Sequence, residues 1–325
     1  MTKISFIVVA YNAADSLRAL LNDLLAQTIP HEQIEALLVD SASTDGTRAL
    51  MLDFAASAPF AVKVLDNPKR WLASGINVAL DAATGDAVIR LDAHARIPKD
   101  FLQNNLRALA QGEDIVGGCV LGGTPKGAWE SVLRTVDTSR FCGGAAPFRN
   151  SGEARYVDTL AYALYRREVY DKVGRYDERL RRTEDNDMHY RMRMAGYRFY
   201  FSPDVISYHA ARSTLRGQLT QKWGNGYWIG RTMRIQPRCF APRHLIPALF
   251  VLALALTLLL LPLSGWPLAL LLCAYAACDL YFACVGALRQ ESGRLLALLT
   301  LPLLFPVIHV VYGVGTLAGL CTGKG

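Results

Sequence analysis

Two short segments combine residue types that can act on a phosphorylated ligand or on a hydroxyl group. The first, LDAHARIP at residues 91–98, follows an apolar run and places Asp92 two positions before His94. A carboxylate and an imidazole at this spacing can bind one divalent cation, and Mn²⁺ accepts this mixed pair while Mg²⁺ prefers oxygen ligands. The alternative interpretation is that Asp92 caps the following loop and His94 is a partly buried structural histidine.

The second segment, RTEDNDMHYRMRMAG at residues 182–196, is rich in carboxylates. A carboxylate held near an acceptor hydroxyl can take its proton, which makes Asp185 and its neighbour Glu184 candidates for a general base. The alternative is that these groups only stabilise the N-terminus of the helix that follows. We expect Asp187 to act as a helix cap or as a partner of Arg191, one turn onward. The buried side of this helix is predicted to carry Met188, Met192 and Met194.

The first 120 residues alternate between strand-like and helix-like patterns. These strands and helices must position the carboxylates and histidines described above. Strands of this length separated by helices favour an α/β fold, with a mostly parallel, Rossmann-like sheet covered by helices on both faces. Asp15 is the predicted N-cap of the first helix. The predicted strands are 3–10, 34–40, 61–66 and 86–92, and the predicted helices are 15–27, 45–57 and 72–83.

Polar residues gather where the predicted strands end. Ligands of open parallel sheets bind outside the carboxyl ends of the strands, so these residues outline one crevice. A dinucleotide-binding domain is a poor match, because AYNAAD replaces the G-x-G-x-x-G that would follow the first strand. Asp45, Gly46 and Thr47 are better explained as a turn that opens a helix. The strand ends carry Tyr11 and Asn12, then Asp40, then Asp66 and Asn67, and then Asp92 and His94.

Three apolar runs near the carboxyl end predict a membrane module over residues 245–325. Each run is close to the about 20 residues that cross the hydrocarbon core of a bilayer. A basic linker, 233–244, precedes them, and the domain that carries the motifs is predicted to cover 1–232. The formal charge of +7 suits an anionic membrane surface and a phosphorylated ligand, but it is common in membrane proteins and does not discriminate. The predicted membrane helices are 245–263, 267–285 and 295–320.

The distribution of arginines predicts the topology of this module. The amino-terminal sequence lacks a signal-peptide core and cleavage site, and arginines precede the first apolar run, so the first domain is predicted to face the cytoplasm with three crossings of the inner membrane. Pro302 and Pro306 leave the third run open to a second interpretation, a kinked or re-entrant segment. Seven cysteines without a CxxC pair or zinc spacing are read as reduced thiols.

Taken in order, several segments resemble inverting family 2 glycosyltransferases with the GT-A fold. The nearest subgroup is the membrane-attached bacterial glucosyltransferases that build succinoglycan-type exopolysaccharides, which also read D-A-H where other members read D-x-D. The resemblance covers residues 3–232 and extends to the tail HVVYGVGTLAGL. The segments that carry it are SFIVVAYN, VDSASTDGT, RLDAH, YRREVYDKVGRYDERLRRTEDNDMHYRMRMAGYRFYFSPD and RSTLRGQLTQKWGNG.

The resemblance implies roles for individual residues. It places the general base at Asp185, beside Glu184, and a divalent cation, Mn²⁺ or Mg²⁺, at His94 and Asp92, with His209 as a weaker ligand. Asp40 corresponds to the aspartate that hydrogen-bonds uracil and Tyr11 to the base pocket. A guanine base also offers donors to a carboxylate, so uracil is favoured and guanine stays open. The segment with Asn67, Lys69 and Arg70 meets a diphosphate or is a solvated loop, and these two interpretations stay open. The donor-binding candidates are Tyr11, Asn12, Asp40, Asn67, Arg70, Asn77 and Asp92.

The segment before the apolar runs holds the candidate acceptor residues, Trp223, Lys222 and Arg212. Gln218, Gln221 and Trp223 are similar to the Q-x-x-R-W motif of processive synthases but have the wrong spacing, which favours single addition. The predicted function is transfer of a sugar, with glucose favoured, from a UDP-sugar to a polyprenyl-diphosphate-linked saccharide. The alternatives are a polyprenyl-phosphate glycosyltransferase and an inactive nucleotide-binding scaffold. Other exopolysaccharide assembly proteins are possible partners, and nucleic acid is not expected.

Overall fold

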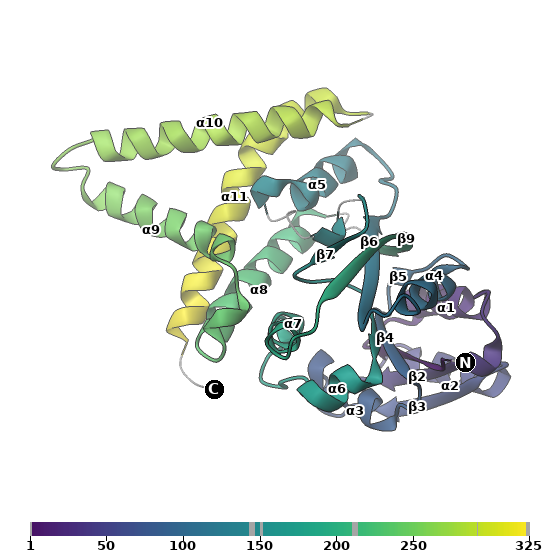
Figure 1. The fold of residues 1–325 in the computed structure, drawn as a ribbon. Helices are drawn as coiled ribbons and strands as arrows, with labels where there is room; N and C mark the ends of the chain where they lie inside the picture. Colours follow the sequence, from purple (N-terminus) through teal and green to yellow (C-terminus); the bar gives the residue numbers. More distant parts are fainter. Residues whose placement is uncertain (1, 143–146, 150–151, 210–213, 291, 323–325) are drawn as a thin grey trace. The chain divides into compact units, whose positions relative to one another are not determined.

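The computed structural model forms two compact units and describes residues 2–142, 147–149, 152–209, 214–290 and 292–322 (Figure 1). The first unit comprises Met1–Gly123 and Ala146–Ala210, and the second comprises Thr124–Ala145 and Ala211–Gly325. The division therefore falls near residue 210 instead of at 232. It also assigns the internal segment around residues 124–145 to the unit that contains the apolar helices.

The first unit is built on a nine-stranded sheet in the order β3-β2-β1-β4-β8-β6-β9-β5, with β7 paired to β9. The first four strands in sequence pair in parallel, as predicted. The remaining strands make the sheet mixed, because β8 is antiparallel to β4 and β6 while β9 is parallel to β6. The strands are β1 (Ile4–Ala10), β2 (Ile34–Asp40), β3 (Ala61–Asp66), β4 (Ala87–Asp92), β5 (Ala95–Arg96), β6 (Ile115–Gly122), β7 (Arg155–Val157), β8 (Leu164–Arg166) and β9 (Phe199–His209).

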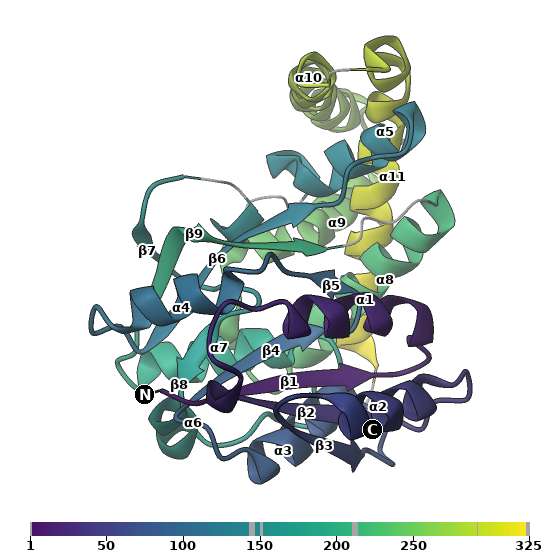
Figure 2. The ribbon, with the colours of Figure 1, turned by 90° about the vertical axis from the view of Figure 1, so that its right-hand side faces the viewer.

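Helices cover both faces of this sheet, as the sequence predicts (Figure 2). Side chains alternate between the two faces along each strand. In β1, Phe6 and Val8 face one core with α1 (Ala14–Leu25), α2 (Thr47–Ser57) and α4 (Phe101–Leu109). Ile7 of the same strand lies in the other core, which includes residues of α3 (Leu72–Ala82), α6 (Arg167–Val173) and α7 (Glu184–Met194).

Two helix details differ from the sequence-based expectation. The helix α1 begins at Ala14 with Ala13 as its N-cap, so Asp15 lies in the first turn and does not cap it. In α7, Met188 and Met192 are fully buried, but Met194 is 66% exposed because it falls outside the stripe that meets the sheet. Both differences reflect a register that periodicity defines only to within a residue or two.

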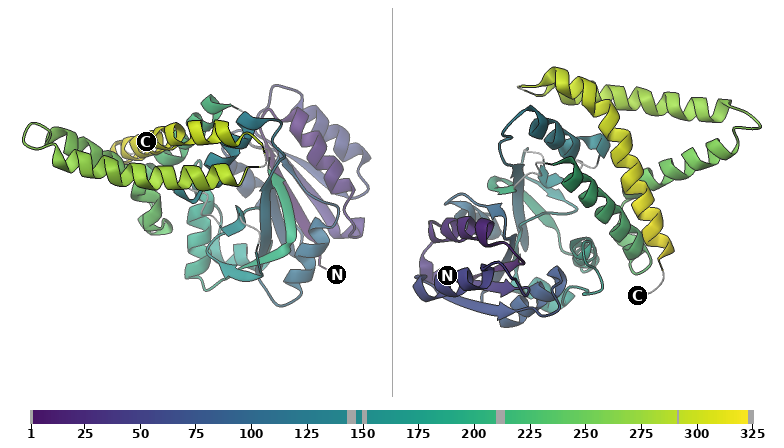
Figure 3. Two further views of the ribbon diagram at one scale, coloured as in Figure 1. Left: turned by 90° about the horizontal axis from the view of Figure 1, so that it is seen from above. Right: turned by 180° about the vertical axis from the view of Figure 1, so that it is seen from behind.

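The second unit is helical. It contains α5 (Ala128–Thr138), α8 (Leu215–Met233), α9 (Ile246–Leu259), α10 (Trp266–Leu288) and α11 (Arg294–Cys321). The segments Pro242–Leu259, Trp266–Leu288 and Arg294–Cys321 are long and apolar enough to cross a membrane, in agreement with the three predicted runs. The helix α11 continues through Pro302 and Pro306, so the kink that prolines can cause does not divide it. Figure 3 shows α9 and α10 joined as a hairpin, with α8 and α11 running side by side.

Candidate active site

Three side chains converge as a candidate metal site in the first unit. Asp92 ends β4, His94 lies in the turn between β4 and β5, and His209 ends β9. β5 and β9 pair in antiparallel register with Ala95 opposite His209, which brings the two histidines together. One ligand atom from each of the three residues lies within 4.8 Å of the others. Residues 115 positions apart thus meet because the two-residue strand β5, which follows β4 in the chain, pairs with β9.

The donor set fits a divalent cation. The Nε2 atoms of His94 and His209 are 2.9 Å apart, and their rings meet edge to face. The spacing is that of a hydrogen bond between the two rings, and it is also close to the about 3 Å between two nitrogen ligands that lie about 2.1 Å from one ion at right angles, so both rings can reach one cation. Burial opposes ionisation of Asp92, but Arg90 and the two histidines outweigh it and lower its pKa, so the carboxylate is charged. Two imidazoles and one carboxylate favour Mn²⁺ over Mg²⁺.

Arg90 connects the candidate metal site to the acidic segment. It lies two residues before Asp92 on β4 and therefore projects from the same face of the strand. Its Nη2 atom is 3.1 Å from Asp185 Oδ2 and 3.8 Å from Asp92 Oδ1, and its Nη1 atom is 3.9 Å from Glu184 Oε1. One guanidinium therefore lies within 4 Å of three acidic side chains and hydrogen-bonds to the Asp185 carboxylate. The sequence analysis missed Arg90, although a charged residue inside the apolar strand AVIRLD is a visible signal.

The two acidic neighbours at the start of α7 have different environments. The Asp185 side chain is 39% exposed, whereas that of Glu184 is 5% exposed and its Oε2 atom has no hydrogen-bond partner among the described residues. Burial, together with the charge of Asp185, raises the pKa of Glu184 well above its usual range. Glu184 is thus a buried carboxyl that favours the protonated form. Its inaccessibility argues against the predicted catalytic role of Glu184 and leaves Asp185 as the candidate base.

A buried histidine fixes the position of α7. His189 accepts or donates hydrogen bonds through both ring nitrogens, to Thr159 Oγ1 and to the hydroxyl of Tyr165, each at 2.8 Å. Burial lowers the pKa of His189 to about 4, so the ring is neutral and can satisfy both hydroxyls. Because Tyr165 belongs to β8, these bonds tie the helix that carries Asp185 to the centre of the sheet.

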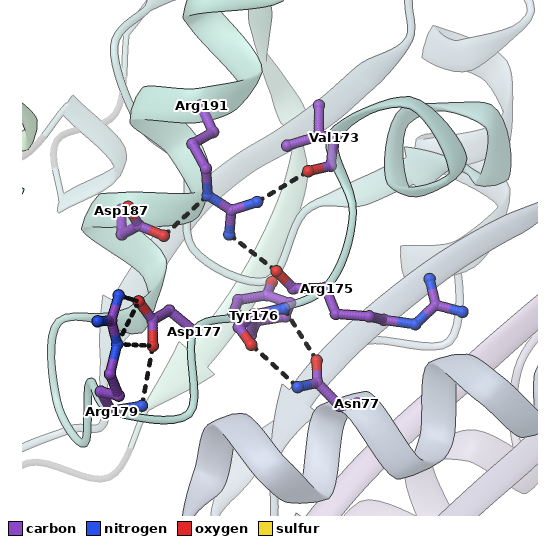
Figure 4. Close-up of polar contacts among 8 residues, drawn as sticks. All are labelled: Asn77, Val173, Arg175, Tyr176, Asp177, Arg179, Asp187 and Arg191. Atoms are coloured by element: carbon purple, nitrogen blue, oxygen red, sulfur yellow. Dashed lines mark hydrogen bonds and ion pairs between the residues drawn. The ribbon is translucent and has the colours of Figure 1, made fainter.

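A second network holds the loop before α7 (Figure 4). Arg191 donates to Asp187 Oδ2 and to the backbone carbonyls of Val173 and Arg175, each at 2.9 Å. The expectation that Asp187 pairs with Arg191 is therefore confirmed. Asn77 accepts a hydrogen bond from the Tyr176 amide and donates to the Tyr176 carbonyl, both at 2.9 Å. Its amide is occupied in this way, which argues against the predicted donor-binding role of Asn77.

The predicted base pocket lies at the carboxyl ends of β1 and β2, where Ala10 pairs with Asp40. Tyr11 is 53% exposed and is available to stack on a ring. Asp40 is 4% exposed and accepts a hydrogen bond from the Ser43 amide at 3.2 Å. Asn12 has a positive φ of 48° and accepts from the Thr44 amide at 2.8 Å, which links the two strand ends. The structure thus brings these three candidates to one edge of the sheet.

The segment after β3 is more ordered than a solvated loop. Asn67 is buried, and its side chain accepts from Ser74 Oγ at 2.8 Å and donates to Ser41 Oγ and to the Trp71 carbonyl. These bonds shape the loop and occupy the amide, so the structure favours a supporting role for Asn67 over direct donor binding. Arg70 is exposed with a positive φ of 64°, and its side chain stays a candidate for the diphosphate. Lys69 pairs with Glu178 at 2.6 Å.

The acceptor candidates belong to the second unit. Trp223 of α8 is 43% exposed and stays a candidate for stacking on a sugar. Lys222 is 9% exposed, and its Nζ atom pairs with Asp137 of α5 at 2.9 Å. This ion pair joins two helices of the unit and argues against the predicted acceptor role of Lys222. Arg212 lies outside the described residues.

Asp92 has a further partner that the sequence analysis missed. The hydroxyl of Tyr162 donates to Asp92 Oδ2 at 3.0 Å, and Tyr162 itself has a positive φ of 53°. A bulky residue in the left-handed region is uncommon and is held there by its surroundings. Because Tyr162 orients the carboxylate toward the histidines, it is a positioning residue. Only its place in LAYALYRR, before the acidic segment, is visible in the sequence.

Comparison with known families and relatives agrees with this geometry. Residues 5–174 match the family model "Glycosyl transferase family 2". The chain is 28% identical over 277 residues to the succinoglycan biosynthesis protein ExoA of Rhizobium meliloti (strain 1021), covering 82% of each chain. It is 23% identical over 241 residues to the dolichyl N-acetyl-alpha-D-glucosaminyl phosphate 3-beta-D-2,3-diacetamido-2,3-dideoxy-beta-D-glucuronosyltransferase of Methanococcus voltae, covering 72% of this chain and 75% of that protein.

Solved structures share the fold. The mannosyltransferase PcManGT from Pyrobaculum calidifontis, in complex with GDP-Man and Mn²⁺, matches with a TM-score of 0.63 at 24% identity. That match covers 98% of this chain and 87% of PcManGT. S. aureus TarS 1-349 in complex with UDP-GlcNAc matches with a TM-score of 0.53 at 21% identity, over 70% of this chain and 66% of TarS. Both likenesses support the GT-A fold.

Proposed function

The chain belongs to glycosyl transferase family 2, and on this premise we propose that it is a membrane-attached, metal-dependent, inverting hexosyltransferase. Its donor is a UDP-sugar, with UDP-glucose favoured, and its acceptor is a polyprenyl-diphosphate-linked saccharide. The observation that carries the proposal is the cluster around Arg90, which holds the exposed carboxylate of Asp185 next to Asp92 of the candidate metal site. A base and a leaving-group site side by side are what sugar transfer requires.

Donor binding follows from the carboxyl edge of the sheet. Tyr11 offers an exposed ring, and the Asp40 carboxylate can accept the N3–H of uracil. His94, Asp92 and His209 would hold a divalent cation, which would supply charge stabilisation to the departing diphosphate. The exposed guanidinium of Arg70 is available to the same phosphates. The ExoA relative acts in succinoglycan biosynthesis, which supports a sugar nucleotide as donor without selecting the sugar.

In the proposed transfer step, Asp185 takes the proton of the acceptor hydroxyl. The acceptor oxygen forms a bond to the anomeric carbon while the bond from that carbon to the diphosphate oxygen breaks, so one nucleoside diphosphate leaves and the configuration inverts. Arg90 keeps the Asp185 carboxylate oriented before the reaction. Its positive charge also offsets the repulsion between the Asp185 and Asp92 carboxylates, which both lie within 4 Å of it.

A lipid-linked acceptor is supported by the apolar helices and by the relatives. Three segments are long and apolar enough to cross a membrane, which keeps the enzyme beside acceptors that diffuse in the bilayer. The Methanococcus voltae relative is named for an acceptor built on a dolichyl phosphate. We place the catalytic domain on the cytoplasmic side of the inner membrane, where nucleotide sugars are made, and other assembly proteins are candidate partners. Transfer directly to a lipid phosphate is the second candidate within this class.

The donor is tested by incubating the purified full-length protein in detergent with Mn²⁺ and a panel of UDP- and GDP-sugars while nucleotide release is followed. We expect UDP release from one UDP-sugar, with UDP-glucose the first candidate, and none from GDP-sugars. Tight UDP binding without turnover on any donor would instead support the inactive scaffold. GDP release from a GDP-sugar would contradict the assignment of Asp40 to uracil.

A further inference from the structure

The helix α11 is long enough to cross a membrane, and its contacts indicate whether its two ends lie on the same side or on opposite sides. At 28 residues it is about 42 Å long, against about 30 Å of hydrocarbon in a bilayer. Length and apolarity alone therefore make it a third crossing after α9 and α10. A crossing helix must have its two ends on opposite sides of the membrane. The segments of the second unit that contact the beginning, the middle and the end of α11 indicate on which side of the membrane each part lies.

The beginning and the middle of α11 contact segments that precede the first apolar helix in the chain. Gly293, the N-cap of α11, packs so closely on α5 that a side chain there would lie 2.7 Å from the Cβ atom of Ala128. In the middle of α11, His309 Nε2 is 2.8 Å from the carbonyl oxygen of Phe141, while its Nδ1 is 2.9 Å from the hydroxyl of Tyr275 in α10. Among the described residues, the first segment long and apolar enough to cross a membrane begins at Pro242. Because α5 and Phe141 precede it, they lie on the same side of the membrane as the first unit, which is called the sheet domain below.

The end of α11 pairs with α8, which also precedes the first apolar helix. A Cβ atom at Gly226 or Gly230 of α8 would lie 2.1 Å from the carbonyl oxygen of Tyr312 or Thr316 of α11. Small residues therefore let the two backbones touch. Gly226 lies against Tyr312, and Gly230, four residues later, lies against Thr316, also four residues later. The two helices are therefore parallel and end at the same level.

Arg234, directly after α8, closes the last turn of α11. Its Nη1 atom donates to the carbonyl oxygens of Leu320 at 3.2 Å and Thr322 at 2.6 Å. These are terminal carbonyls that lack a partner within the helix, and a cation there also matches the helix dipole. Arg234 belongs to the basic linker before α9. The end of α11 therefore lies where the first apolar helix begins, and Gly313 of α11 also packs on the Pro247 carbonyl at the start of α9.

From these contacts we propose that α11 does not cross the membrane. It lies along the interface on the side of the sheet domain, with α5, the Phe141 segment, α8 and parts of α9 and α10 packed against it and lipid against its exposed face. The chain then crosses only as the α9–α10 hairpin, and Cys321 faces the same compartment as the sheet domain. This arrangement revises the third crossing predicted from composition and is independent of the proposed function.

The exposed face of α11 fits this position. An apolar stripe with helical spacing runs from Leu295 to Val314, while the opposite face is covered by α5, α8, α9 and α10. An interfacial helix buries such a face about 5–10 Å into the boundary between headgroups and acyl chains. The occupant is therefore the bilayer, and the basic linker suits its anionic headgroups. The stripe consists of Leu295, Leu299, Leu303, Val307 and Val314.

The charges of α8 argue against the alternative. If α11 crossed the membrane, α8 beside it would place Arg216 and Arg231 at the depth of the hydrocarbon. A charged side chain there costs about 3 kcal/mol or more. By contrast, α9 and α10 are exposed over most of their surface, with large apolar side chains such as Leu259, Leu263 and Trp266 at the tip of the hairpin. The exposed apolar surface of the α9–α10 hairpin is therefore suited to contact with the hydrocarbon of the bilayer.

The test measures which side of the membrane Cys321 faces. The full-length chain, with its other six cysteines replaced by alanine, is labelled with a membrane-impermeant maleimide in intact cells and in inverted membrane vesicles. Two reference variants, each also carrying Cys321→Ala, have one cysteine: Ser57→Cys on α2 reports the side of the sheet domain, and Ser264→Cys reports the hairpin tip. We expect Cys321 to label in the same preparation as Ser57→Cys. Labelling of Cys321 in the other preparation would overturn the proposal.

A second measurement covers the case in which lipid shields Cys321 or the alanine replacements disturb the fold. An epitope tag is added after Gly325 of the otherwise unchanged protein, and protease is applied to intact cells and to inverted vesicles. Loss of the tag only in vesicles, together with digestion of the sheet domain, supports the proposal. Loss of the tag in intact cells, with the sheet domain protected, means that α11 crosses.

Discussion

Replacing Asp185 with asparagine is expected to lower turnover by about 10²-fold or more, the usual scale for losing a general base. Asparagine keeps the shape of the side chain and can still accept a hydrogen bond from Arg90, but it cannot take a proton at neutral pH. The fold is expected to survive. Because the charge of Asp185 is one cause of the raised pKa of Glu184, its removal lowers that pKa and lets Glu184 pair with Arg90. Affinity for UDP should be nearly unchanged.

Asp187→Asn, two residues onward, is the matched control. Asp187 is buried and accepts from Arg191, which also holds the carbonyls of Val173 and Arg175. Weakening this charged hydrogen bond is expected to cost about 1.5–3 kcal/mol of unfolding free energy and to change turnover much less than Asp185→Asn. Single-turnover kinetics and thermal unfolding separate the two effects. An inactive Asp187→Asn beside an active Asp185→Asn would show that the base is wrongly assigned, and two active variants would reduce the acidic segment to a helix cap.

Replacing His94 with alanine is expected to weaken Mn²⁺ binding by more than the about 10–100-fold that follows loss of an outer-shell partner of a metal ligand. Activity should fall with it, disappear in chelator, and return best with Mn²⁺. His94→Asp should keep part of the activity and shift the preference toward Mg²⁺, because it restores an oxygen ligand. Calorimetry of Mn²⁺ binding in the presence of UDP measures the affinity, and nucleotide release measures the activity.

His31→Ala provides the control for losing a histidine. His31 lies in the same unit, where its ring packs edge-on against Phe60, and it has no place in the candidate metal site. We expect its replacement to leave Mn²⁺ affinity and metal preference unchanged. Full activity of the wild-type protein in chelator would remove the metal from the account. An equal loss of Mn²⁺ affinity in both variants would remove His94 from the ligand set.

The sequence predicted the parts of the site that depend on strand ends. Parallel strands bring their carboxyl ends to one edge, so Tyr11, Asp40 and Asp92 could be grouped before any coordinates. The pairing of β5 with β9 was not predictable, because β5 has only two residues and carries no periodic signal. His209 therefore stayed a weak candidate, although the structure places it 2.9 Å from His94.

Side chains that support the site were harder to identify than those that form it. Asn67 and Asn77 lie beside the predicted crevice and have suitable chemistry, but the structure uses their amides to hold loops. Lys222 likewise pairs with Asp137, 85 positions away in the chain. The spacing of residues in the sequence cannot distinguish a polar side chain that binds a ligand from one that hydrogen-bonds to a buried group of the protein. Both roles use the same donors and acceptors.

The central claim, inverting transfer of a sugar to a lipid-linked acceptor, is tested most directly by following a radiolabelled sugar. Membranes that contain the full-length protein receive Mn²⁺ and the labelled donor that the nucleotide-release panel selects, and the label is counted in the lipid extract. We predict label in lipid with the wild-type protein, in a linkage of opposite anomeric configuration to the donor, and about 10²-fold less with Asp185→Asn. Nucleotide release with the label recovered only as free sugar, or a linkage of retained configuration, would contradict the account.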